Sequence, residues 1–106
     1  MTTFDDRKDS FEKMQAYDDE QAFKTVARRN KLMGLWIAEK IGLTGADAES
    51  YAKDVVAADL AVAGDDDVVQ KIMADLELYK IDLSEHRVRV KLTELHDEAR
   101  RQISAS

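Results

Sequence analysis

The chain of 106 residues has no cysteine, no proline, only four glycines and a single tryptophan. The absence of cysteine excludes disulfides and thiolate metal sites. The absence of proline leaves few residues that would interrupt a helix. The N-terminus lacks the basic start and apolar run of a signal peptide, and no stretch approaches the ~18 apolar residues of a membrane span. We therefore expect a protein that does not insert into a membrane, and a cytoplasmic location fits this composition.

The charge balance is acidic, with 22 Asp and Glu against 16 Lys and Arg and a net charge of −6. An acidic chain is a poor general binder of nucleic acid, because phosphate backbones attract basic surfaces. The length corresponds to one domain. Charged residues make up 36% of the chain, and Ala, Leu and Val are the commonest apolar types, which is typical of all-α proteins. We expect an all-α fold, a four-helix bundle.

The stretch from Phe23 to Gly42 should form the central helix of this bundle, because it is apolar on two sides. A helix of this kind must be covered on both sides, so the other helices should pack around it. One broad face comprises Phe23, Val26, Ala27, Met33, Gly34, Ile37, Ala38 and Ile41, and the opposite side carries Leu32, Leu35 and Trp36.

Helix boundaries follow from glycines and capping residues. We expect the bundle to cover residues 20–106, with helices at about 20–41, 46–63, 66–78 and 84–103. Gly42 should end the first helix in a left-handed conformation, and Thr44 with Asp47 has the form of a capping box. Asp65 or Asp66 should cap the third helix. Ser84, or Asp82 with Glu85, should cap the fourth.

Each of the three later helices carries an apolar stripe with helical spacing, which should face the core. In the second helix the stripe is Tyr51, Val55, Ala58 and Val62, widened by Ala48 and Ala52. In the third helix it is Val69, Ile72, Met73 and Leu76, and in the fourth it is Val88, Leu92, Leu95, Ala99 and Ile103.

The first 20 residues are polar and acidic, with seven acidic and three basic residues and a net charge of −4. Their sparse apolar residues are Phe4, Phe11, Met14 and Tyr17. Thr2 or Thr3 would cap a helix here, with Asp5 and Asp6 in its first turn. Two interpretations stay open. The segment is either a nascent helix that orders on a partner, or a solvated extension of the first bundle helix.

A basic stretch follows, because Lys24, Arg28, Arg29 and Lys31 are the only charged residues between Gln21 and Ala38. Acids of neighbouring helices would neutralise these bases in one interpretation. In the other, Arg28, Arg29 and Lys31 form a docking surface for an acidic partner or a phosphate-bearing ligand. Asp59 lies beside Val55 and Val62 on the apolar side of its helix. It has two interpretations as well, because it either pairs with a base or faces a ligand.

Catalytic and metal-binding patterns are absent from the sequence. Four scattered glycines cannot form a phosphate-cradling loop. Asp65-Asp66-Asp67 lacks the glycine and distal glutamate of a calcium loop. His86 and His96 lie on different faces of one helix, and we expect both at the surface. We therefore expect no enzyme, no metal and no cofactor, apart from weak nucleotide binding as an alternative.

The basic stretch nevertheless resembles a known pattern. The residues Ala27-Arg28-Arg29-Asn30-Lys31-Leu32, Gly34-Leu35-Trp36 and Ala38-Glu39 resemble the central motif of the zeta subunit family of alpha-proteobacterial F1-ATPase inhibitors. The N-terminal run from Thr2 to Arg7 with Phe11-Glu12 is also similar, as are Tyr51-Ala52, Val55-Val56, Ala58-Asp59, Ala63-Gly64-Asp65 and Asp67-Val68. The resemblance covers nearly the whole chain.

This resemblance implies a four-helix bundle with a mobile inhibitory arm at residues 1–19. It implies an inhibitor subunit of F1FO-ATP synthase, peripheral to the inner membrane, whose partners are the alpha, beta and gamma subunits. The arm would insert as a helix at their catalytic interface and block ATP hydrolysis. The implied partner-binding residues are Thr3, Phe4, Asp5, Asp6, Arg7, Lys8, Phe11, Glu12, Met14 and Tyr17. The residue-based alternatives are a nucleotide-binding module and an adaptor bundle.

Overall fold

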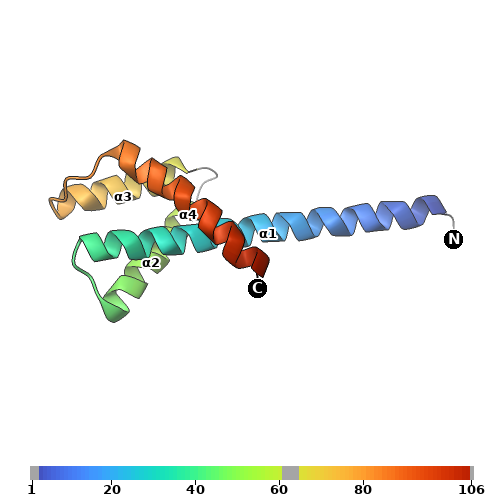
Figure 1. Ribbon diagram of the computed structural model, residues 1–106, viewed down its shortest axis with the longest axis horizontal. Helices are drawn as coiled ribbons and strands as arrows, with labels where there is room; N and C mark the ends of the chain where they lie inside the picture. The colour runs from blue at the N-terminus through green and yellow to red at the C-terminus, as the bar shows by residue number, and fades with distance from the viewer. Residues whose placement is uncertain (1–2, 61–64, 106) are drawn as a thin grey trace.

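Within the residues that it describes, the computed structural model contains four helices: α1 (Thr3–Lys40), α2 (Gly45–Leu60), α3 (Asp66–Leu78) and α4 (Glu85–Ala105) (Figure 1). The structure describes the backbone of residues 3–60 and 65–105, and the side chains of residues 19–58 and 65–105. The molecule is elongated, with dimensions of 64 × 25 × 21 Å. The expected all-α fold with four helices is confirmed. No helix within the described residues is long and apolar enough to cross a membrane.

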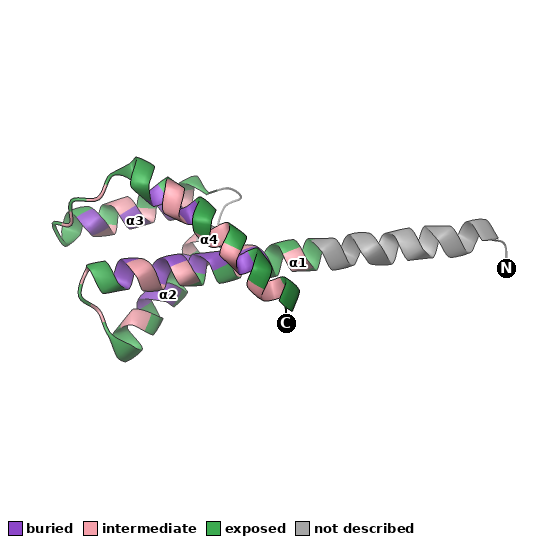
Figure 2. Cartoon of the chain, in the orientation of Figure 1, coloured by how far each residue is buried: buried purple, intermediate pink, exposed green. Residues whose placement is uncertain are grey.

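The C-terminal half of α1 lies at the centre of the bundle, as expected. It packs mainly against α2 and α4, and α3 packs on α2 and α4. Met33, Ile37 and Ala38 are completely buried, and this half of α1 is largely buried in the bundle (Figure 2). Trp36, on the other side of the helix, packs against the same core and is partly buried. A helix that is apolar on both sides is therefore covered on both sides.

The first helix differs in its start from the sequence-based expectation. α1 begins at Thr3, whereas we placed the first bundle helix from about residue 20. The arm and the central helix thus share one continuous helical backbone. Whether residues 1–19 form a separate mobile arm stays a prediction, because side chains before residue 19 lie outside the described part. Phe23 is a second difference, since this member of the expected apolar face is 60% exposed.

The turn between α1 and α2 has the expected glycine, but its hydrogen bonds among the described residues join backbone groups and do not include the side-chain bonds of the predicted capping box. Gly42 adopts a φ of +87°, a left-handed conformation that glycine tolerates at low cost. The Leu43 N–H donates to the carbonyl of Ala38 at 2.8 Å, which closes the helix end in the manner of a Schellman turn. The Thr44 carbonyl then accepts from the Asp47 N–H at 3.2 Å and opens α2. The predicted end of α1 at Gly42 is confirmed.

The start of α3 corrects our capping prediction. Asp65 occupies the N-cap position, but its side chain makes no capping hydrogen bond. Its carboxylate instead lies 2.9 Å from the guanidinium of Arg29 on α1. Asp66 likewise lies 3.0 Å from the guanidinium of Arg89 on α4. The two acids join α3 to the flanking helices, because an arginine offers a stronger charge-assisted partner than a backbone N–H does.

The last helix is capped by Ser84, one of the predicted residues, whose hydroxyl oxygen accepts from the Arg87 N–H at 3.1 Å.

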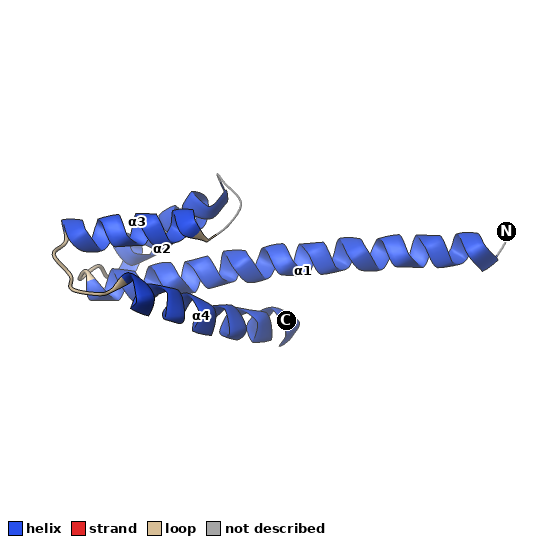
Figure 3. Cartoon of the chain, turned by 90° about the horizontal axis from the view of Figure 1, so that it is seen from above, coloured by secondary structure: helices blue, strands red, loops and turns tan. Residues whose placement is uncertain are grey.

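The apolar stripes that we expected to face the core in the later helices are largely confirmed. Tyr51, Ala52, Val55, Val69, Ile72, Leu76, Val88, Leu92 and Ala99 are buried, and Val68 joins them. Ala48, Ala58, Met73, Leu95 and Ile103 are partly buried. Val62 and the predicted last turn of the second helix lie outside the described residues. All four helices are shown in a second view in Figure 3.

Candidate protein-interaction site

The N-terminal part of α1 carries all the residues that we assigned to partner binding. The backbone of residues 3–18 continues the helix of the bundle. The side chains of Thr3, Phe4, Asp5, Asp6, Arg7, Lys8, Phe11, Glu12, Met14 and Tyr17 lie outside the described residues, and so does that of Asp59. Their roles in binding stay predictions.

The basic stretch of α1 divides into a buried member and exposed members. Arg29 is buried, with 4% of the residue exposed. Its Nε donates to the Asn30 side-chain oxygen at 3.0 Å, and its Nη2 lies 2.9 Å from the Asp65 carboxylate. A buried cation paired in this way is not free to attract an outside ligand, and loss of its partner would leave an uncompensated buried charge.

The other bases of this stretch are accessible. Arg28 is exposed, and it has no carboxylate partner among the described side chains. Lys31 lies 4.0 Å from Glu49 of α2, and Lys24 lies 3.1 Å from Glu20. Both pairs are about half exposed, and exposed ion pairs contribute little to stability. The structure therefore places Arg28 and Lys31 together at the surface and separates Arg29 from them.

A shallow hollow of about 410 Å³ lies at this surface. We call it the basic groove, and it is lined by Phe23, Lys24, Ala27, Arg28, Lys31, Val56 and Ile103. The residues come from α1, from α2 and from the last turns of α4. Its chemistry combines an exposed aromatic ring with three cations. A surface of this kind suits a partner segment that is both apolar and acidic.

A second hollow, between α1, α3 and α4, is lined in part by Arg29, Asp65, Arg89, His96 and Asp97. Its two arginines are already paired with acids. Arg89 contacts Asp66 and Glu85 at 3.0 and 3.3 Å, and these hydrogen bonds raise its pKa above the ordinary value. Arginines that are already paired with carboxylates are poorly suited to bind a phosphate.

Two clusters of side chains that were not predicted from the sequence stabilise the bundle. The hydroxyl of Tyr51 on α2 donates to the Asp75 carboxylate on α3 at 2.8 Å, and Lys71 contacts the same oxygen at 3.1 Å. Burial, and then the hydrogen bond to Asp75, raises the pKa of Tyr51 well above 10. The i, i+4 spacing of Lys71 and Asp75 was readable in the sequence, but the partner of Asp75 across the helices was not.

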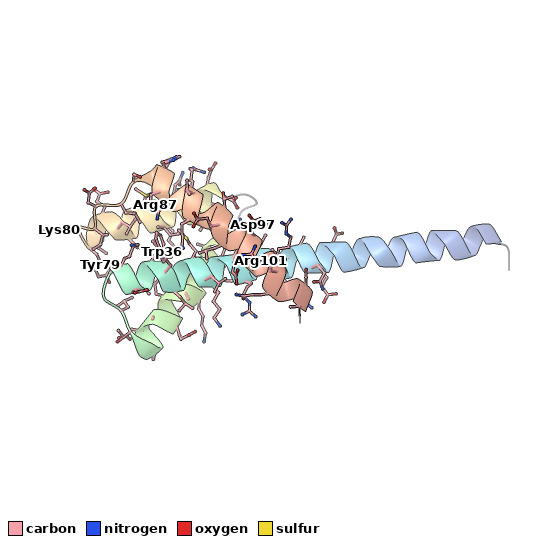
Figure 4. The ribbon with its side chains drawn as sticks, in the orientation of Figure 1. Trp36, Tyr79, Lys80, Arg87, Asp97 and Arg101 are labelled. Carbon is pink, nitrogen blue, oxygen red and sulfur yellow. The ribbon has the colours of Figure 1, made fainter. Side chains whose placement is uncertain are left out.

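Trp36 forms the second cluster. The ammonium of Lys40 lies 4.5 Å from the centre of its ring, and that of Lys91 on α4 lies 5.3 Å away. Cations at this distance over an aromatic face are attracted by the ring. Figure 4 shows Trp36 on the central helix. The contact with Lys40 follows from i, i+4 spacing, whereas the contact with Lys91 depends on how α4 crosses α1.

The fold and these surfaces define a class of protein. Within residues 19–58 and 65–105, no group of three His, Cys, Asp or Glu side chains is arranged to hold a metal ion. The charged side chains serve helix packing or line shallow surfaces. These features describe a small helical protein with charged, shallow surface hollows.

Comparison with known proteins gives the family. The family model for ATPase inhibitor subunit zeta matches residues 1–102, and the chain therefore belongs to this family. This confirms the resemblance found in the sequence. A subunit of this family regulates an ATPase and is not itself an enzyme.

One solved structure is informative for the fold. A protein whose structure was determined by solution NMR is 44% identical in sequence, with a TM-score of 0.70. The similarity covers 78% of this chain and 94% of that chain. No curated protein matches the chain.

Proposed function

We propose that this ATPase inhibitor blocks ATP hydrolysis by F1FO-ATP synthase through its N-terminal helix, inserted at the catalytic interface of the alpha, beta and gamma subunits. The observation that carries this proposal, together with the family, is the continuity of α1 from Thr3 to Lys40. The C-terminal half of that helix is fixed in the core by Met33, Ile37 and Ala38. A helix anchored at one end is a suitable device for presenting the other end to a partner.

The residue types of the N-terminal segment suit insertion into a groove. Phe4, Phe11, Met14 and Tyr17 supply apolar anchors of the kind that hold an amphipathic helix in a hydrophobic groove. Asp5, Asp6, Arg7, Lys8 and Glu12 supply polar contacts that fix its register, and Thr2 or Thr3 would cap the helix. Ordering side chains on docking lowers the net affinity, which favours a reversible inhibitor.

The bundle has a separate task in this proposal. It anchors the inhibitor to the outside of the enzyme, on the cytoplasmic side of the inner membrane, and the inhibitor inserts no segment into the membrane. The described core supports such a division, because its buried apolar residues begin at Met33. Removal of the first 19 residues should therefore leave the core intact.

The test is ATP hydrolysis by the cognate F1-ATPase with the full chain and with a variant lacking residues 1–19. We expect the full chain to inhibit and the shortened chain to lose inhibition while its circular dichroism keeps the helical signal of the bundle. Phe4→Ala with Phe11→Ala should weaken inhibition. Tyr79→Ala is the matched control, since this exposed aromatic residue lies at the far end of the bundle (Figure 4). Equal inhibition by the shortened and full chains would contradict the mechanism.

A further inference from the structure

The basic groove contains an apolar residue with no described cover. Phe23 is 60% exposed and lines the same hollow as Val56 of α2 and Ile103 of α4. Large aromatic side chains at a surface are commonly covered when a protein binds its partner. A partner that covers Phe23 would also meet the cations at the edge of the groove.

The charge of the groove indicates the chemistry of this partner. Arg28 has no described carboxylate partner, and the ion pair of Lys31 with Glu49 is long, at 4.0 Å. Side chains in such exposed pairs exchange partners at little cost. An incoming carboxylate would therefore find two accessible cations next to an exposed aromatic ring.

One segment with the complementary properties is present in the chain itself. Residues 1–20 carry seven acidic and three basic residues, for a net charge of −4, and include Phe11 and Met14. The basic groove and this acidic segment belong to the same long helix, α1. Because the segment and the groove lie on one continuous helix in the structure, we assign the segment that fills the groove to another molecule.

We propose that the basic groove binds the N-terminal segment of a second copy of this chain, with the two α1 helices antiparallel. Each groove then receives the segment of the other copy, and the contact closes with twofold symmetry. The inference does not depend on the proposed mode of inhibition. If this inference and the proposed mode of inhibition both hold, pairing occupies the segment that would otherwise engage the ATPase. At high concentrations of the inhibitor, only part of it would then be free to inhibit.

One register satisfies both charge and apolar contacts. In antiparallel helices, residues further along one helix meet residues further back on the other. When Met14 of the second copy lies at Phe23, Asp9 lies at Arg28 and Asp6 lies at Lys31. The same register brings Lys13 to Lys24, and Glu20, at 3.1 Å from Lys24, offsets that repulsion.

Sedimentation equilibrium over a range of protein concentrations, at low and at 0.5 M salt, tests this pairing. We expect the average mass of the full chain to rise toward twice that of one chain, and the rise to weaken at high salt. Arg28→Glu with Lys31→Glu should raise the dissociation constant at least about tenfold. Lys80→Glu with Arg87→Glu makes the same change of charge at the opposite end of the bundle (Figure 4) and should leave it unchanged.

A charge exchange makes the test independent of folding defects. A chain with Asp6→Lys and Asp9→Lys should also fail to pair with itself. Mixed with the Arg28→Glu, Lys31→Glu chain, it should recover pairing, because each groove again faces a segment of opposite charge.

Two results would overturn the proposal. One is a single-chain mass at every concentration, and the other is failure of the mixed variants to pair. If the first result is found and the chain with Arg28→Glu and Lys31→Glu also binds the ATPase more weakly, the groove serves the enzyme instead.

Discussion

Gly34 of α1 lies against the backbone of Ala52 of α2, so that a Cβ atom added to Gly34 would be only 2.6 Å from the Cα of Ala52. Real Cβ atoms do not approach another heavy atom so closely. The backbones of the two helices are thus in direct contact at this point. This contact sets how α2 crosses α1, and it explains a glycine in the middle of a helix, where glycine is otherwise unfavourable.

We expect Gly34→Ala to destabilise the protein by about 1–3 kcal/mol, because the overpacking exceeds the gain of up to about 1 kcal/mol in helix propensity. Urea unfolding followed by circular dichroism measures the change. Ala22→Gly, at an exposed position of the same helix, is the reverse control and should lose about 1 kcal/mol through propensity alone. A Gly34→Ala protein as stable as the unchanged chain would show that the helices can separate freely.

The neighbouring arginines Arg28 and Arg29 should respond differently to the same conservative change. Arg29→Lys keeps the charge but loses the planar group that contacts both Asn30 and Asp65. We expect it to lower the free energy of unfolding by about 1–3 kcal/mol. Arg28→Lys, at the exposed position next to it, should stay within about 0.5 kcal/mol. Similar losses at both positions in urea unfolding would contradict this division.

Tyr51 should make stability depend on pH in the alkaline range. Its pKa in the folded protein is raised well above the ordinary value of 10.0, first by burial and then by its hydrogen bond to Asp75. Above pH 10 the unfolded chain loses the phenolic proton while the folded chain keeps it, so stability falls as pH rises, by up to about 1.4 kcal/mol per pH unit. Below pH 10 this contribution is fully present.

Urea unfolding between pH 8 and 11 tests this dependence with Tyr51→Phe, which removes the titrating group. The variant should lose stability less steeply above pH 10 than the unchanged chain does. Tyr79→Phe, at an exposed tyrosine that has only a minor electrostatic effect on the pKa of Tyr51, controls for the removal of a hydroxyl and should change the slope much less. The same slope in all three proteins would mean that Tyr51 is not the group responsible.

Lys80 offers a site for stabilisation. It follows α3 with a φ of +58°, a left-handed conformation that costs a residue with a side chain about 1 kcal/mol relative to glycine. The Ile81 N–H donates to the carbonyl of Leu76 at 2.8 Å, which fixes this conformation. We expect Lys80→Gly to raise the free energy of unfolding by roughly 0.5–1 kcal/mol. Lys80→Ala keeps the strain and should bring no such gain, so a gain in both would point to charge instead.

The sequence distinguished exposed residues from buried residues only in part. The spacing of Val88, Leu92 and Ala99 placed them in the core, because a regular helix presents residues of this spacing on one face. The adjacent bases Arg28 and Arg29 look equivalent in sequence, and α3 makes them different by bringing Asp65 to one of them. Phe23 follows the apolar pattern but lies where the covering helices end, so it is exposed.

The sequence by itself determined the helical class, the turn at Gly42, the serine cap of the last helix and the family. These depend on local properties, namely periodicity, glycine at a left-handed turn, a serine cap and the run of residues around Trp36. Only the tertiary structure decided that Asp65 and Asp66 bind arginines of other helices instead of capping their own, and that Arg28, Lys31 and Phe23 line one groove. Such choices depend on which helices meet and at what distance, because an ion pair or a shared surface forms only when packing brings the groups together.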